Sequence, residues 1–397
     1  MPRNHLRDII GKVTGSGSSY ACLALILSLC LRADVYAQNP SLVKRYIASV
    51  TRDTADVSRP QALVYPTFGY SPETGIEVGL SGLLLFYHHK DTSNRLSEVT
   101  ARAFYTLENQ YGAFSEHALY ADQDRWFFLG EVRFQDFPLA FYGIGPDTEK
   151  DREQLVESRQ LMVKERVLRK IHRNIFFGVE AEYSKTSDVT FLPPKHPSQL
   201  PEEIAGQNGF SNFALGLGLV LDSRHNVLNV RDGYFSELAV LQSIRNFGST
   251  YDYGYLSLDN RYFKSFHKDR VLALQGFYQR NWGDTPFNQL PQLGGPNLLR
   301  GYYLGRFRDK ELLAIQAEYR YLPLPLGFTE RIGAAGFASA GTVGPGEGVP
   351  ILTGKWKTSA GMGLRVLLFP KKDIYVRWDF AFTNEGQGMY IYIGEAY

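Results

Sequence analysis

The chain has 397 residues, a formal net charge of +2 and 44% hydrophobic residues. The balanced charge excludes the strongly basic footprint of a nucleic-acid-binding domain. The 25 Tyr, 26 Phe and 38 Gly residues indicate a β-rich protein, because aromatic residues are enriched in strands.

The N-terminus has the pattern of an export signal. Arg3, Arg7 and Lys12 precede an apolar run at residues 21–31, and small or β-branched residues lead to a cleavage position after Ala37. Residues 1–37 are therefore predicted to be a signal peptide, and the apolar run is too short to span a bilayer.

Both cysteines of the chain, Cys22 and Cys30, lie inside this segment. A lipoprotein interpretation of Cys30 is disfavoured because Leu29 stands where a small residue is needed. The mature chain is predicted to contain no disulfide and no cysteine-ligated metal.

Residues 38–60 are polar and are interpreted as a short periplasmic segment, either a short helix or irregular chain. They are too few for an independent domain, which needs roughly 40 residues or more. Residues 61–397 read as sixteen strands with about 20 residues per strand and connection, the spacing of an outer-membrane barrel.

The strands alternate with a period of two. In 312–321, Leu313 and Ile315 begin an apolar face, whereas Gln316, Glu318 and Arg320 share the other face. The segments 213–221 and 374–382 show the same alternation. A soluble β-sandwich has the same period. The connections favour a barrel instead, because short ones, such as those ending at residues 174 and 269, alternate with long ones at 138–150, 188–210, 283–310 and 342–356. The sequence therefore predicts an all-β, 16-stranded antiparallel transmembrane β-barrel.

One connection is unusual. The stretch LGGPNLLRGYY at 293–303 is too rich in Gly and Pro for a strand, and too apolar for open water. It carries a single Arg300, and a buried guanidinium is costly unless carboxylates pair with it. The stretch is expected to fold back into a shielded cavity.

These residues resemble the BamA/TamA-like outer-membrane family, also called the bacterial surface antigen family. Residues 293–302 are similar to its GG-x-x-x-[VI]-R-G-[FY] motif, with Leu299 at the Val/Ile position. The segments 221–235 and 70–79 and the terminal strands also look like family segments, with Val230 replacing a proline in the first. The resemblance implies that this loop is the sixth extracellular loop, folded into the lumen, and that it acts as a latch. The latch motif comprises Gly294, Gly295, Leu299, Arg300, Gly301 and Tyr302.

Two departures qualify the resemblance. Residues 38–60 leave no room for a POTRA domain, so the chain is identified as a member lacking them. The family's F-x-D-x-G strand, whose Asp pairs with the loop Arg, has Ser339 at the Asp position. Arg300 is then expected to use other lumen carboxylates, with Asp379 the first choice and Glu318, Glu237 and Asp259 the further candidates.

The resemblance also implies a weak seam between the first strand, from about residue 61, and the terminal strand at 387–397. The latter carries Tyr390, Tyr392, Gly394 and the terminal aromatic Tyr397. A seam of this kind implies protein insertion into, or export across, the bacterial outer membrane. The expected partners of the protein are outer-membrane lipid and either unfolded client proteins or a POTRA-bearing protein. The alternative is a passive pore or a structural surface barrel.

No enzymatic site is predicted. The sequence contains no H-E-x-x-H, P-loop or G-x-S-x-G pattern, and the histidines lack metal-ligand spacing. The adjacent His88 and His89 belong to a polar turn. We therefore expect no catalytic residues, no cofactor and no metal.

Overall fold

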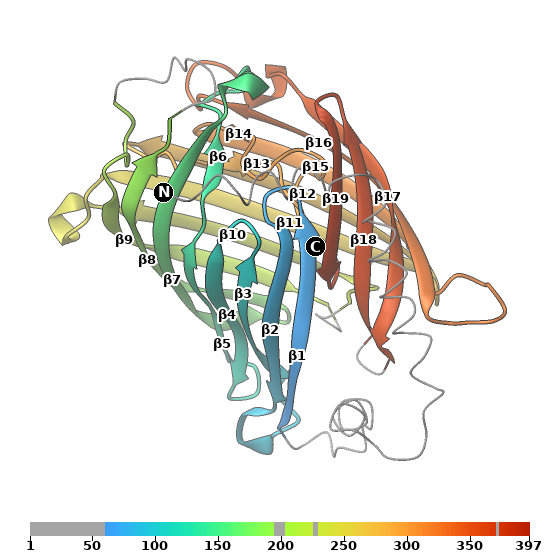
Figure 1. Ribbon diagram of the computed structural model, residues 1–397. Coiled ribbons are helices and arrows are strands. Elements are labelled where there is room, and N and C mark those ends of the chain that lie inside the picture. Colours follow the sequence, from blue (N-terminus) through green and yellow to red (C-terminus); the bar gives the residue numbers. More distant parts are fainter. Residues whose placement is uncertain (1–59, 194–202, 225–228, 371–372) are drawn as a thin grey trace. The chain divides into compact units, whose positions relative to one another are not determined.

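The computed structural model describes residues 60–193, 203–224, 229–370 and 373–397. The predicted signal peptide and nearly all of the 38–60 segment lie outside these residues, and so do parts of the connections near 198, 226 and 371. The described chain folds into one closed antiparallel barrel of sixteen strands, which confirms the predicted fold class (Figure 1).

Eight wall strands form the N-terminal half of the barrel. They are β1 (Gln61–Ser71), β2 (Gly75–Phe86), β3 (Ser97–Thr106), β4 (Tyr111–Ala121), β5 (Trp126–Asp136), β7 (Gln154–His172), β8 (Ile175–Phe191) and β9 (Phe210–Asp222).

Eight wall strands form the C-terminal half. They are β10 (Gly233–Ser243), β11 (Tyr253–His267), β12 (Arg270–Gly283), β15 (Glu311–Tyr321), β16 (Ile332–Gly344), β17 (Lys357–Phe369), β18 (Ile374–Thr383) and β19 (Gly386–Ile393). Each strand pairs with its sequence neighbours, and β19 returns to β1 to close the wall.

The long connections gather at one rim. They include 137–153, 192–209, 284–310 and 345–356, whereas the opposite rim has two-residue turns at 173–174 and 268–269. Two of the predicted loops contain further structure: β6 (Leu139–Phe141) pairs with β7, and β13 (Gln292–Leu293) pairs with β14 (Phe307–Arg308) inside the sixth loop. Short 3-10 helices occur at His88–Lys90, Lys150–Arg152, Arg245–Phe247 and Ile351–Thr353. Among the described residues no helix is long and apolar enough to cross a bilayer.

The two faces of the wall differ as the alternation predicts. Outward side chains such as Leu217 and Ile315 are 51% and 52% exposed, whereas the inward Glu318 and Arg320 of the same wall are fully buried. An apolar outer face suits lipid, since polar groups gain nothing from contact with hydrocarbon. The charged side chains are thereby concentrated in the lumen, where they must satisfy one another.

Candidate functional site

The sixth loop, residues 284–310, connects β12 with β15 and folds back on itself (Figure 1). Gly294 and Gly301 have φ of 115° and 106°, a region that favours glycine. The Gly295 amide donates to the Tyr302 carbonyl at 3.1 Å, which closes the fold of the loop. Its apolar side chains pack against the wall in one buried cluster, formed by Leu293, Leu299, Tyr302, Phe307, Leu312, Ala314 and Val343.

Arg300 is fully buried inside the barrel. Its Nη1 donates to Asp379 Oδ2 at 2.6 Å, and its Nη2 donates to Glu318 Oε2 at 2.5 Å. The guanidinium also lies over the Phe337 ring, 3.5 Å from the ring centre. Two carboxylates and an aromatic face together offset the burial of this charge.

The two carboxylates belong to a larger charge network that joins three strands. Arg365 of β17 donates to Asp379 Oδ1 at 2.6 Å and to Glu318 Oε1 at 3.2 Å. Arg320 of β15 donates to Glu318 at 2.8 Å, and Arg377 of β18 lies 3.4 Å from Asp379. The loop arginine is thus one member of a buried network of arginines and carboxylates.

Of the four candidate carboxylates, the structure brings Asp379 and Glu318 to Arg300 and leaves the other two elsewhere. Glu237 on β10 pairs with Arg166, and Asp259 on β11 accepts from Arg261 at 2.6 Å. Their inclusion was wrong because they lie on strands further around the wall, although they share the inward face with Glu318.

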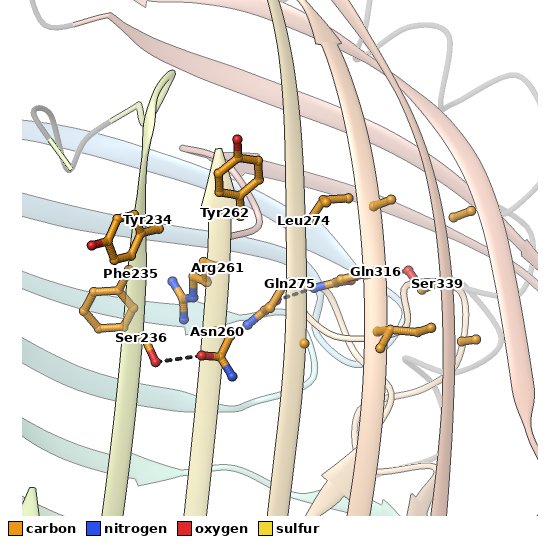
Figure 2. A pocket seen from close by; sticks show the side chains of 15 residues that line it. Tyr234, Phe235, Ser236, Asn260, Arg261, Tyr262, Leu274, Gln275, Gln316 and Ser339 are labelled. Atoms are coloured by element: carbon orange, nitrogen blue, oxygen red, sulfur yellow. Dashed lines mark hydrogen bonds between the residues drawn. The ribbon is translucent and has the colours of Figure 1, made fainter. Parts of the chain in front are cut away.

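Ser339 stands at the family's Asp position and is buried. It belongs to a row of uncharged side chains that are joined by hydrogen bonds. Its hydroxyl donates to Gln316 Oε1 at 3.3 Å, and Gln316 Nε2 donates to Gln275 at 2.6 Å (Figure 2). Figure 2 also shows Ser236 and Asn260 joined by a hydrogen bond on the neighbouring strands. The serine contributes no charge to the Arg300 network.

The terminal strand is joined to the loop by Tyr390. The Gly301 amide donates to the Tyr390 hydroxyl at 2.9 Å, and this hydroxyl donates to the Tyr302 carbonyl at 3.3 Å. A Cβ on Gly388 would lie 2.9 Å from the Tyr390 hydroxyl and 3.0 Å from the Gly301 Cα, so a larger residue there would push the strand and the loop apart. Sequence reasoning assigned Tyr390 only to the terminal strand and missed its bonds to the loop.

The last residues turn away from the wall. The terminal strand ends at Ile393 and does not extend to 397 as expected, since Gly394 has a φ of 91°. Glu395 accepts from Arg365 at 2.9 Å, and the Tyr397 hydroxyl donates to the Ala273 carbonyl at 3.2 Å. The C-terminal aromatic residue therefore lies in the lumen instead of completing the strand.

The wall is weakest between β1 and β19. Within these two strands, both fully described, the ladder contains a single registered pair, Tyr70 with Ile391. On the other side of β1, pairing with β2 runs from Gln61–Leu85 to Ser71–Gly75. Few backbone hydrogen bonds therefore close the barrel at this seam.

The sixth loop contacts both sides of that seam at the rim. The Leu304 amide donates to Glu73 Oε1 at 2.7 Å, in the turn between β1 and β2. Arg306 donates to both oxygens of Glu385, at 2.7 and 2.9 Å, in the turn between β18 and β19. We call these contacts the clasp.

Burial raises the pKa of Glu73 above its ordinary value, and the hydrogen bond from Leu304 only partly offsets this.

Comparisons with known proteins agree with this architecture. Residues 108–371 match the Omp85 superfamily domain. The fold is similar to BamA from Haemophilus ducreyi lacking POTRA domains 1–3, with a TM-score of 0.57 and 13% identity over 85% of this chain and 70% of that one.

CdiB from Acinetobacter baumannii and CdiB from Escherichia coli each align with a TM-score of 0.52, at 10% and 9% identity. The alignments cover 84% and 83% of this chain but 59% and 62% of the CdiB chains. No curated protein sequence matches this chain. Because the domain match covers more than half of the 397 residues, the chain belongs to the Omp85 superfamily and is a barrel of the bacterial outer membrane.

Proposed function

We propose that this barrel takes part in the insertion of proteins into the outer membrane, or in their export across it, by opening at the seam between β1 and β19. The observation that carries the proposal is the single registered pair, Tyr70 with Ile391. An exposed strand edge is a template for another strand, so an opened β1 offers its backbone groups to a client chain.

In this proposal the sixth loop is the latch. Its motif is anchored in the lumen by Arg300, and the clasp ties the turns that flank the seam. Opening then requires the loss of few backbone hydrogen bonds together with the contacts of Glu73 and Glu385. Side-chain contacts of this kind reform readily after a client has left.

Membership in the Omp85 superfamily and the similarity to BamA and CdiB barrels support the proposal. Its partners are outer-membrane lipid, an unfolded client protein and a POTRA-bearing protein that delivers the client. No enzymatic step is needed, since strand exchange at the seam is driven by backbone pairing.

The test is a disulfide that locks the seam. Tyr70 and Ile391 face each other across the ladder, at a separation that suits a disulfide. The double variant Tyr70→Cys/Ile391→Cys is reconstituted in liposomes with a urea-denatured outer-membrane barrel as the client. Oxidation is expected to abolish insertion of the client, measured by its heat-modifiable gel mobility, and reductant should restore it.

The matched control is Tyr70→Cys/Ile76→Cys, which joins β1 to β2 and leaves the seam free. This control should insert the client whether oxidised or reduced. Insertion at the wild-type rate by the oxidised seam variant would rule out lateral opening.

The second candidate is a passive pore, favoured by a lumen cavity of about 520 Å³ between the loop and the wall. A single-channel recording separates the two functions. A pore predicts a large, constant conductance in the intact protein, whereas a latched barrel predicts a blocked, flickering signal that becomes large when residues 284–310 are shortened.

A further inference from the structure

Arg308 lies at the end of the sixth loop. The residue is 3% exposed, and within the described part of the chain no carboxylate forms an ion pair with it. Its guanidinium donates to the carbonyls of Phe287 and Gly305, both at 3.4 Å, and Nε has no hydrogen-bond partner among the described residues. The Phe141 ring lies beneath it, 4.9 Å from the ring centre.

The neighbouring arginines of the loop differ in this respect. Arg300 has two carboxylates and Arg306 has a bidentate one, whereas Arg308 has two long bonds to neutral oxygens. Burial lowers the pKa of Arg308 to about 10, so the side chain is still protonated at neutral pH. A buried, unpaired positive charge is destabilising, and carbonyls and an aromatic face offset only part of its cost.

Arg308 borders the lumen cavity of about 520 Å³, a volume in the range of small-molecule sites. The cavity lies between the loop and the inner faces of the wall, mainly of β3 to β8. Three further arginines line it, but each already has a carboxylate: Arg102 pairs with Glu77, Arg133 with Glu131, and Arg377 with Asp379. Of the four arginines that line the cavity, Arg308 is the one without a carboxylate partner in the described part of the chain.

Aromatic rings form part of the cavity wall next to Arg308. Phe141 and Phe287 meet edge to face, with ring centres 5.4 Å apart, and both line the cavity. Further rings come from Phe104, Phe114 and Phe137. At this part of the cavity the rings favour an apolar body over a strongly hydrated ion such as a free phosphate.

We propose that this cavity binds a small carboxylate with an apolar body, with its carboxylate on Arg308 and its body against Phe141 and Phe287. One guanidinium fork matches one carboxylate in geometry and in charge. The ligand would neutralise the unpaired cation and replace the weak bonds to the carbonyls. This site does not depend on lateral opening at the seam, so it stands apart from the proposed function.

The experiment is calorimetric titration of the purified full barrel in a non-ionic detergent with 3-phenylpropionate as the probe. Acetate tests the charge without the apolar body, and 3-phenylpropanol tests the body without the charge. Phenylpropionate should bind at least tenfold more tightly than either. Arg308→Gln should lower its affinity at least tenfold, and Arg308→Lys should lower it less.

The matched control is Arg152→Gln, which removes an exposed arginine of another outer loop, paired with Glu149. This variant should bind the probe as the wild type does. Equal binding by wild type and Arg308→Gln, or no preference for phenylpropionate over phenylpropanol, would overturn the proposal.

A measurement on the wild type alone keeps the test valid if Arg308→Gln fails to fold. Phenylpropionate should raise the temperature at which the barrel loses its folded gel mobility, because a ligand that binds only the folded state stabilises it. Phenylpropanol at the same concentration should leave that temperature unchanged. The absence of a shift with phenylpropionate would also overturn the proposal.

Discussion

The β7–β8 hairpin and the β1–β19 seam of the barrel wall differ in how many backbone hydrogen bonds join their strands. The hairpin is registered from Val156–Phe191 to His172–Ile175 with two irregularities, so backbone hydrogen bonds hold it along most of its length. The seam has one registered pair, and side-chain contacts add to it, among them those of the loop with Glu73, Glu385 and Tyr390. Closure at the seam therefore depends on side chains, whereas closure elsewhere depends on the ladder.

This difference has a physical consequence. A long ladder opens only with the cooperative loss of many hydrogen bonds, but side-chain contacts are lost and regained one at a time. In the proposed function, the seam is the place where the wall would open at least cost. The anchor of the loop in the lumen would then set how firmly the seam is closed.

The largest effect is expected from Arg300→Ala, which removes the anchor. The change leaves Glu318 and Asp379 buried with one arginine fewer, and breaking a buried ion pair costs about 3–5 kcal/mol. The barrel should lose its folded gel mobility at a lower temperature and unfold at a lower urea concentration. Arg152→Ala, at an exposed ion pair, should change neither, and wild-type heat resistance of Arg300→Ala would contradict an anchoring role.

The next largest effect should follow from Arg306→Ala, which opens half of the clasp. Loss of a bidentate hydrogen-bonded pair costs about 1.5–3 kcal/mol, so amide exchange in β19 and β1 should accelerate about tenfold or more. Exchange in β7 and β8 should not change. Arg159→Ala, which breaks ion pairs on β7, is the control, and faster exchange throughout the barrel would mean that the clasp is not specific to the seam.

A smaller effect is expected from Tyr390→Phe, which removes one hydroxyl between the terminal strand and the loop. The partly buried Gly301 amide loses its acceptor, and a donor left unpaired away from water costs up to about 1–3 kcal/mol. The urea midpoint should fall by less than in Arg300→Ala. Tyr319→Phe, on the lipid-facing side of β15, should behave as the wild type. Equal effects of the two changes would mean that the Tyr390 hydroxyl does not help to hold the loop.

The smallest effect is expected on the pH dependence of the stability of the barrel, through Glu73 in the turn beside the seam. Burial raises its pKa, so the folded state binds this proton more tightly than the unfolded state does. The burial penalty is therefore present at neutral pH and is relieved as the pH falls through the raised pKa towards the ordinary value. Glu73→Gln should be more stable than the wild type at neutral pH, and this difference should shrink on acidification. A difference that grows at low pH would contradict this assignment.

Much of the architecture follows from the sequence because a strand has a period of two. The alternation in 312–321 and 374–382 separates lipid-facing from lumen-facing residues, and it placed Glu318 and Asp379 inside the barrel. The costly Arg300 in a Gly-rich, apolar stretch indicated a buried loop in need of carboxylates. The number of strands, their antiparallel order and the outer-membrane location followed from the same patterns and are confirmed.

The tertiary structure alone decided which inward residues meet. Alternation gives the face of a residue but neither its position around the barrel nor its depth, so Glu237 and Asp259 could not be separated from Asp379. The contact of Leu304 with Glu73 joins residues 231 positions apart in sequence, and the inward turn after Gly394 depends on lumen arginines. These contacts depend on strand stagger and loop path, because only the closed wall brings distant segments of the chain into one lumen.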